Sequence, residues 1–107
     1  MITADALERF RARLEAEQGA RYAEQWPGAY AQDRIARDCA AHVHYGPKYT
    51  RVDVGTSGKY MVENSTGAIY GIKGYGRVHR GHAYGTLDTV DDWDWSGYRA
   101  VPRRGTP

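Results

Sequence analysis

Residues 48–87 read KYTRVDVGTSGKYMVENSTGAIYGIKGYGRVHRGHAYGTL, and this stretch decides the fold. Apolar and polar side chains alternate along it, so that Thr50, Val52 and Val54 share one face of an extended segment. Short runs rich in Gly, Asn, Ser and Thr interrupt the alternation, and these residues favour turns. Because such short turns join neighbouring antiparallel strands, the stretch predicts a β-meander.

The predicted strands lie between these turns. The turns are residues 55–58 and 64–67, followed by a hairpin around Arg80-Gly81. Glycines at 71, 74 and 76 permit bulges, which would switch the side chains that point to each face. The sequence therefore leaves open which face of the sheet is exposed. The predicted strands span residues 49–54, 59–63, 68–73, 75–79 and 82–87.

The residues before the meander have helical spacing. Leu7, Phe10 and Leu14 recur at intervals of three and four, which predicts a helix that begins after an N-cap at Thr3. We expect this helix to reach about residue 18, with Gly19 as a stop and residues 21–26 open as an extension. A second helix is predicted over residues 29–42, between the breakers Trp26-Pro27-Gly28 and Gly46-Pro47.

These elements predict an α+β domain in which two N-terminal helices pack on a four- to five-stranded antiparallel β-meander. A chain of 107 residues has the length of a single domain, divided into a helical part (1–47), the meander (48–87) and an acidic, Trp-bearing segment with a loose basic tail (88–107). No apolar run approaches the ~20 residues that cross a bilayer, and no secretory signal begins the chain. With Cys39 as its only cysteine, the chain is expected in a reducing cytoplasm, without a membrane partner.

Charge is separated along the sequence. Residues 48–86 hold six cations and two acids, and residues 87–98 hold four aspartates and no cation. Cationic side chains interleaved with tyrosine are suited to phosphate contact and base stacking, so nucleic acid is the first candidate partner. If the tyrosines are buried and the cations scattered, this hypothesis loses its basis. The candidate binding residues are Arg51, Lys59, Tyr70, Lys73, Tyr75, Arg77, Arg80 and Tyr84.

Three short motifs resemble functional sites but do not fit them. Residues 73–80 match part of an RNA-recognition strand, but Arg77 and Arg80 replace the aromatic residues that stack on bases. Residues 55–59 resemble a phosphate loop, but Tyr60 stands where a magnesium-binding hydroxyl is needed. A zinc site built from Cys39 and the histidines is disfavoured, because Cys39 lies on the predicted apolar helix stripe. We therefore predict no metal, no cofactor and no catalytic constellation, hence a non-enzymatic binding module.

Trp93 and Trp95 lie in the acidic segment and allow two interpretations. They either fold back over the core or form anchors of a protein interface, because tryptophan is enriched at such interfaces. The second interpretation gives the alternative function, a modulator of a host protein such as a defence system or the transcription machinery. Homodimerisation through an exposed sheet edge is a further alternative.

The segments YTRVDVG, GKYMVE, IYGIKGYG and YGTLDT resemble a recurrent stretch in small uncharacterised proteins of actinobacterial phages and prophages. The resemblance covers about half of the chain and none of the helical part. It implies a phage accessory protein that acts in the bacterial cytoplasm, and it carries no catalytic residues.

Overall fold

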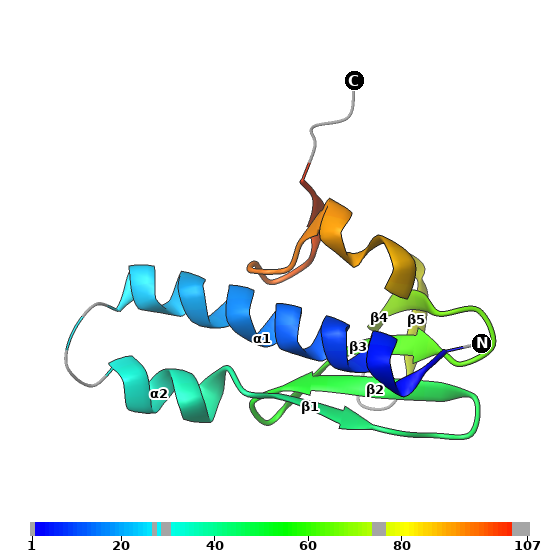
Figure 1. Cartoon of the computed structure of the whole chain (residues 1–107), viewed down its shortest axis with the longest axis horizontal. Helices are drawn as coiled ribbons and strands as arrows, with labels where there is room; N and C mark the ends of the chain where they lie inside the picture. Colours follow the sequence, from blue (N-terminus) through cyan, green and yellow to red (C-terminus); the bar gives the residue numbers. More distant parts are fainter. Residues whose placement is uncertain (1, 27, 29–30, 74–76, 104–107) are drawn as a thin grey trace.

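A five-stranded antiparallel sheet forms the centre of the computed structural model, which describes residues 2–26, 28, 31–73 and 77–103 (Figure 1). Each strand pairs with the next one along the chain, in the order β1-β2-β3-β4-β5. This order confirms the predicted meander and the α+β class. The strands are β1 Ala41–His44, β2 Tyr49–Val54, β3 Ser57–Glu63, β4 Ala68–Ile72 and β5 Val78–Thr86.

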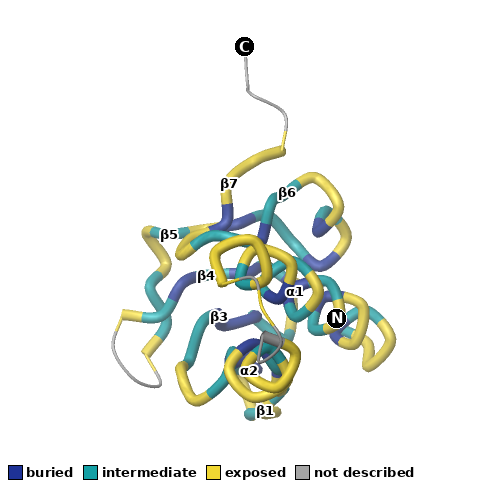
Figure 2. Tube along the Cα trace, turned by 90° about the vertical axis from the view of Figure 1, so that its left-hand side faces the viewer, coloured by how far each residue is buried: buried dark blue, intermediate teal, exposed yellow. Residues whose placement is uncertain are grey.

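Helix α1, Ala4–Gln25, lies along one face of the sheet and closes the core from that side (Figure 1). Its stripe of Leu7, Phe10 and Leu14 is buried, as the spacing predicts. No described helix covers the opposite face (Figure 2). The remaining elements are α2 Ala31–Asp38, the 3-10 helix η1 Leu87–Asp92, and the short strands β6 Trp93–Asp94 and β7 Val101–Pro102.

Helix α1 continues past Gly19, where the sequence predicts a stop. Gly19 is buried, and a Cβ atom there would lie 3.1 Å from Cγ2 of Ile35 in α2. The missing side chain therefore lets the two helices approach closely, and this contact offsets the low helix propensity of glycine. The extension through residues 21–26 is correct as far as Gln25.

The predicted second helix is too long. Helix α2 ends at Asp38, and Ala41 and His42, which were predicted to end it, belong instead to strand β1, in which Val43 pairs with Val52. The Ala41 amide donates to Glu15 Oε1 at 2.8 Å, and its carbonyl accepts from Arg11 at 3.4 Å. Long-range pairing of this kind overrides local helical spacing. Because β1 is an edge strand, these two hydrogen bonds also occupy backbone groups of Ala41 that a second chain would otherwise pair with.

Trp95 lies at the centre of the core with 0% of its surface exposed. Its indole Nε1 donates to the Val90 carbonyl at 2.8 Å. Its ring meets the rings of Phe10 and Tyr60 edge to face, with centroids 4.8 and 5.3 Å apart. The prediction that this segment folds back over the core is thus confirmed for Trp95. As a fully buried side chain, Trp95 is not an exposed interface anchor.

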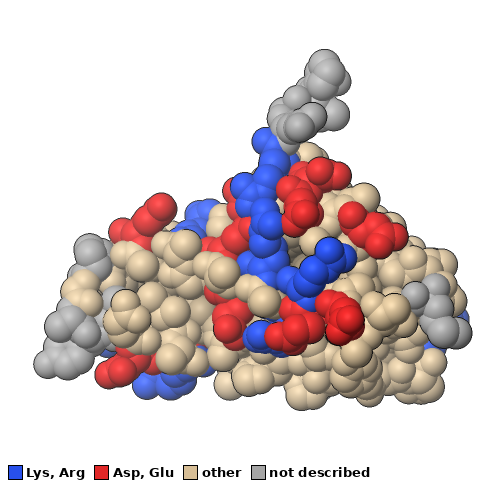
Figure 3. Space-filling view, viewed as in Figure 1, with Lys and Arg blue, Asp and Glu red and all other residues tan. Residues whose placement is uncertain are grey.

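Glu17 of α1 holds the C-terminal segment against the helix. Its carboxylate accepts hydrogen bonds from the Trp95 amide at 2.8 Å and from Arg103 at 2.6 Å, and it also pairs with Arg13. Arg13 in turn bonds Asp91 at 2.6 Å. Figure 3 shows basic and acidic side chains lying side by side on this face. The charges here pair with one another, which makes the face a poor site for an added anion.

Replacing Glu17 with alanine is expected to lower the free energy of unfolding by about 1–3 kcal/mol, because the Trp95 amide loses its acceptor. Urea denaturation followed by circular dichroism measures the change. Glu24 is a matched control on the same helix, since it is exposed and makes no hydrogen bond with a described residue. Its alanine variant is expected to stay within about 0.5 kcal/mol of the parent. Equal stability of the two variants would contradict the role given to Glu17.

Strand β5 contains a bulge where the sequence predicts a hairpin. Tyr70 of β4 pairs with Ala83, whereas the next residue, Gly71, pairs with His79, so residues 80–82 bulge out of the ladder. The predicted strands 75–79 and 82–87 are therefore one continuous strand from Val78, and residues 75 and 76 lie outside the described part. The bulge brings the rings of His79 and His82 together, with centroids 3.9 Å apart.

Candidate functional site

The candidate binding residues do not share one surface. Tyr84 is buried in the core, on the face covered by α1, and Lys59 lies half-buried at the edge of that face. Tyr70 and Arg80 lie on the opposite face, where the Arg80 guanidinium stacks 4.8 Å above the Tyr70 ring. Tyr75 lies outside the described residues. The single basic, tyrosine-rich face that the sequence predicts is therefore not formed, and the nucleic-acid hypothesis loses that basis and needs another.

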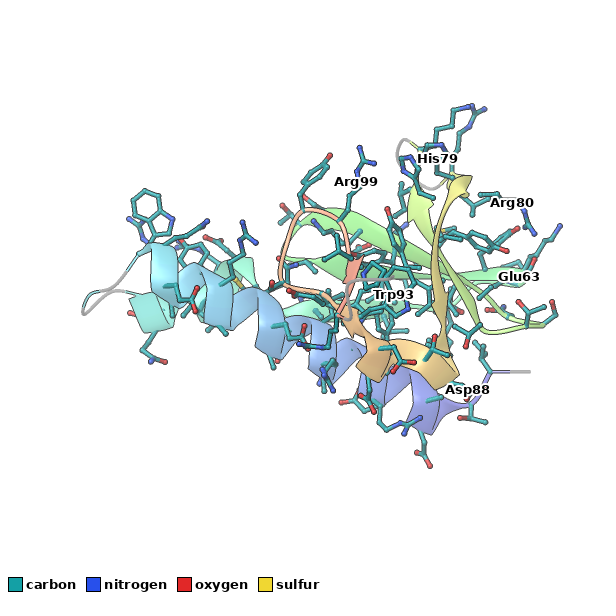
Figure 4. The ribbon with its side chains drawn as sticks, turned by 90° about the horizontal axis from the view of Figure 1, so that it is seen from above. Glu63, His79, Arg80, Asp88, Trp93 and Arg99 are labelled. Atoms are coloured by element: carbon teal, nitrogen blue, oxygen red, sulfur yellow. The ribbon has the colours of Figure 1, made fainter. Side chains whose placement is uncertain are left out.

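On the face without helices, carboxylates neutralise the candidate cations. Arg80 pairs with Glu63 at 3.2 Å and also bonds the Tyr49 hydroxyl. Arg51 pairs with Asp53 at 2.8 Å. Figure 4 shows Arg80 and Glu63 together, at one end of the sheet and away from His79 and Arg99. These arrangements hold the sheet face together and leave little net positive charge for a ligand.

A pocket of about 530 Å³ lies between the sheet and the chain segment that carries Tyr98 and Arg99. This volume falls within the range of small-molecule sites, ~300–1,000 Å³. Strands β3, β4 and β5 supply most of its lining, including His79, His82 and Tyr84. No Asp or Glu of the described residues lines it, so the pocket wall is cationic and aromatic.

Two cations of the pocket have no carboxylate partner. Lys59 makes neither a hydrogen bond nor an ion pair within the described chain, and its ammonium lies 4.7 Å from the centre of the Tyr98 ring. Arg99 is exposed and likewise forms no ion pair with a described residue. Figure 4 shows Arg99 and His79 at the same edge of the molecule. An anion entering the pocket would therefore meet cations without first displacing a carboxylate.

Burial shifts the pKa of several side chains that line this pocket. It raises the pKa of the Tyr60 and Tyr84 hydroxyls, so both keep their protons at neutral pH and can donate hydrogen bonds. It lowers the pKa of the Lys59 ammonium. The pKa of His82 is lowered by burial first, and then by the charges of His79 and Arg99.

The Tyr60 hydroxyl is a buried polar group without a protein partner among the described residues. The residue is 1% exposed, and its hydroxyl makes no hydrogen bond of normal geometry with the described protein atoms. The Ala100 backbone acts to lower the pKa of this hydroxyl, but burial is the larger effect and raises it. Buried hydroxyls are nearly always bonded, so Tyr60 is an exception within the described chain, and its oxygen is closed to solvent in this conformation.

The remaining sequence candidates lie beside this pocket or away from it. Lys73 and Arg77 are exposed and close the β4–β5 connection, with the Lys73 amide donating to the Arg77 carbonyl at 2.8 Å. They flank the lining residues Ile72 and His79 along the chain. Trp93 is half-buried, with its ring edge to face with Tyr84 in the core.

The sequence analysis did not identify Tyr98 and Arg99 as residues that line the pocket. It considered His79 and His82 only as metal ligands. Within the described chain, no three His, Cys, Asp or Glu side chains gather closely enough to hold a metal ion. The spacing of His79 and His82 was a usable signal, but no local pattern ties Arg99 to them. In the part of the chain that the structure covers, every helix is too short or too polar to cross a membrane.

Comparison with known proteins adds no relative. No family model, no curated protein and no solved structure matches this chain. The function must therefore be argued from the site itself.

Proposed function

We propose that the protein is a small non-enzymatic module that binds nucleic acid, through the pocket and the adjoining side chains of Lys73 and Arg77. The observation that carries the proposal is a group of four cations without a carboxylate partner among the described residues. These cations are Lys59, Lys73, Arg77 and Arg99. Lys59 and Arg99 line the pocket, and Lys73 and Arg77 flank it along the chain.

Phosphate contact and base stacking are both supported by this arrangement. Unpaired Lys and Arg side chains neutralise phosphates and release counterions, which supplies most of the affinity for nucleic acid at low salt. Tyr98 is 86% exposed beside the pocket, so its ring can receive a base. Such stacking contributes ~1–3 kcal/mol per base in single-stranded complexes. Single-stranded DNA or RNA is therefore the preferred form of the ligand.

The alternative of a host-protein modulator has lost its main support. It rested on Trp93 and Trp95 as anchors, and these side chains pack in and against the core. The resemblance to actinobacteriophage proteins supports a bacterial cytoplasm as the setting, where DNA and RNA are both available. We therefore prefer nucleic acid to a protein as the partner.

The test is binding of a fluorescently labelled single-stranded 20-mer, DNA or RNA, followed by anisotropy at low salt. Combined alanine substitution of Lys73, Arg77 and Arg99 is expected to weaken binding by roughly 10–100-fold. It should also reduce the slope of log K against log salt by about 0.7 for each phosphate of the single strand that the variant no longer neutralises. The far-UV spectrum is expected to be unchanged, because the three side chains are exposed.

Arg9 and Arg34 supply a matched control, because both are exposed and make no ion pair with a described residue. Their double alanine variant loses net charge without touching the pocket, and its affinity is expected to change less than threefold. The proposal fails if neither single- nor double-stranded DNA or RNA binds the parent protein at low salt. It also fails if the control double variant weakens binding as strongly as the pocket variant does.

A further inference from the structure

The stacked imidazoles of His79 and His82 form one wall of the pocket. Their ring centroids lie 3.9 Å apart and their planes differ by 39°, so the two rings almost touch. The bulge in β5 produces this contact, because residues 80–82 leave the ladder between the partners of Gly71 and Tyr70. The register of β5 against β4 therefore fixes the contact between the two rings.

Among the described residues, every charged group that lines the pocket beside the pair is positive. Lys59 of β3 and Arg99 of the C-terminal segment line the same pocket, and the hydroxyls of Tyr60, Tyr84 and Tyr98 are its other ionisable groups. No carboxylate of the described residues lines it. Protonating the imidazoles therefore adds positive charge beside existing positive charge, with no counter-charge from the described protein. The direction of the His82 pKa, lowered by burial and then by His79 and Arg99, agrees with this.

An anion would supply the missing counter-charge. A phosphate oxygen can accept hydrogen bonds from an ammonium, a guanidinium, a protonated imidazole and a tyrosine hydroxyl, all of which the pocket offers. Tyr98, which lines the pocket and is 86% exposed, supplies such a hydroxyl. The pocket volume of about 530 Å³ exceeds what a phosphate alone fills, which leaves room for an attached nucleoside.

We infer that this pocket is a phosphate subsite, in which one phosphate of a nucleic-acid strand binds between Lys59, Arg99 and the His79–His82 pair, together with a proton that the pair takes up. The inference rests on the proposed function, since it names the part of the surface that receives the backbone. It goes further in making binding proton-linked. The ligand is not changed covalently, and the proton that binds an imidazole nitrogen comes from solvent.

The sharpest probe is a dinucleotide joined by one phosphodiester, compared with its uncharged methylphosphonate analogue. The phosphodiester keeps one negative charge between pH 5.5 and 8, so a pH effect on its binding comes from the protein. Isothermal titration in two buffers of different ionisation enthalpy measures proton uptake. We expect the phosphodiester to bind at least tenfold more tightly than the analogue at pH 6. We also expect roughly tenfold weaker binding at pH 8, because the pair gives up the linked proton as the pH rises.

Two variants separate the pair from the rest of the protein. The double variant His79→Gln/His82→Gln is expected to lose both the pH dependence and the proton uptake, while Lys59 and Arg99 keep residual affinity. His42→Gln is the control, because His42 is exposed on β1 and does not line the pocket. It should leave both properties unchanged. Imidazole proton resonances of the parent protein provide a measurement without any substitution, and the dinucleotide should shift those of His79 and His82.

The outcomes separate the subsite from the proposed function. In one outcome the 20-mer binds and its affinity depends on Lys73 and Arg77, so the proposed function stands. If the dinucleotide then binds without proton uptake, or binds the double histidine variant with an unchanged pH dependence, the subsite is wrong. If no 20-mer binds while the phosphodiester binds with proton uptake, the pocket binds the phosphate of a small molecule, and both the proposed function and the assignment of a nucleic-acid strand to the pocket are wrong. Equal binding of the phosphodiester and the methylphosphonate overturns the subsite outright.

Discussion

Replacing Trp95 with alanine is expected to lower the free energy of unfolding by about 3–5 kcal/mol, the typical cost of truncating a buried aromatic side chain. The ring is fully buried against Phe10 and Tyr60, so truncation leaves a cavity at the point where α1, β3 and the C-terminal segment meet. It also leaves the Val90 carbonyl without its indole donor. Since a domain of this size has about 5–15 kcal/mol of stability in total, the variant should be close to unfolding at 37 °C.

Urea denaturation at 25 °C, followed by circular dichroism, measures the loss. Trp26→Ala is the matched control, because Trp26 is 59% exposed at the end of α1. Its variant should stay within about 0.5 kcal/mol of the parent. A Trp95→Ala variant that is as stable as Trp26→Ala would show that Trp95 is not a core residue. It would also restore the hypothesis that Trp95 is an interface anchor.

Replacing Gly85 with alanine is expected to lower the free energy of unfolding by about 2–5 kcal/mol. Gly85 has a φ of +73°, a left-handed conformation that costs roughly 1–2 kcal/mol for any residue with a Cβ. A Cβ there would also lie 2.5 Å from Thr89 Oγ1 and 2.7 Å from Trp93 Nε1, so η1 or the Trp93 ring would have to move. Overpacking of this kind adds ~1–3 kcal/mol.

Gly81→Ala tests whether that cost belongs to the site or to glycine replacement in general. Gly81 lies in the same strand, is exposed, and would place its Cβ at an ordinary 3.5 Å from His79 Nε2. Its variant should change stability by less than about 0.5 kcal/mol. Thermal unfolding of the two variants in parallel gives the comparison. Equal melting temperatures would mean that Gly85 is not under the constraint described.

The meander could be predicted because its signals are local. Alternation with a period of two and Gly-rich turns lie within a few residues of each other, as in residues 49–67. Strand β1 could not be predicted in the same way, since residues 41–44 follow a helix without a strong breaker. What makes them a strand is pairing with β2 and hydrogen bonding of Ala41 to Arg11 and Glu15, about thirty positions away.

The candidate site was predictable in chemistry but not in location. Lys59, Lys73 and Arg77 were predicted as binding residues from their charge, yet the structure separates them from Arg51 and Arg80, which carboxylates neutralise. Alternation alone cannot predict this division, because the bulge in β5 changes which side chains share a face. Arg99 joins the pocket only because Gln18 and Glu17 fix the chain around Trp95, through contacts that span almost the whole sequence.

The bond between Glu17 and the Trp95 amide joins residues 78 positions apart, and this has a consequence for the protein during its synthesis. At translation rates of about 5–20 residues per second, helix α1 emerges roughly 4–16 s before the residue that covers it. Through that interval the stripe of Leu7, Phe10 and Leu14 has no tryptophan to pack against. A nascent chain in this state is a natural client for a ribosome-associated chaperone, and the yield of folded protein in a cell should depend on that protection.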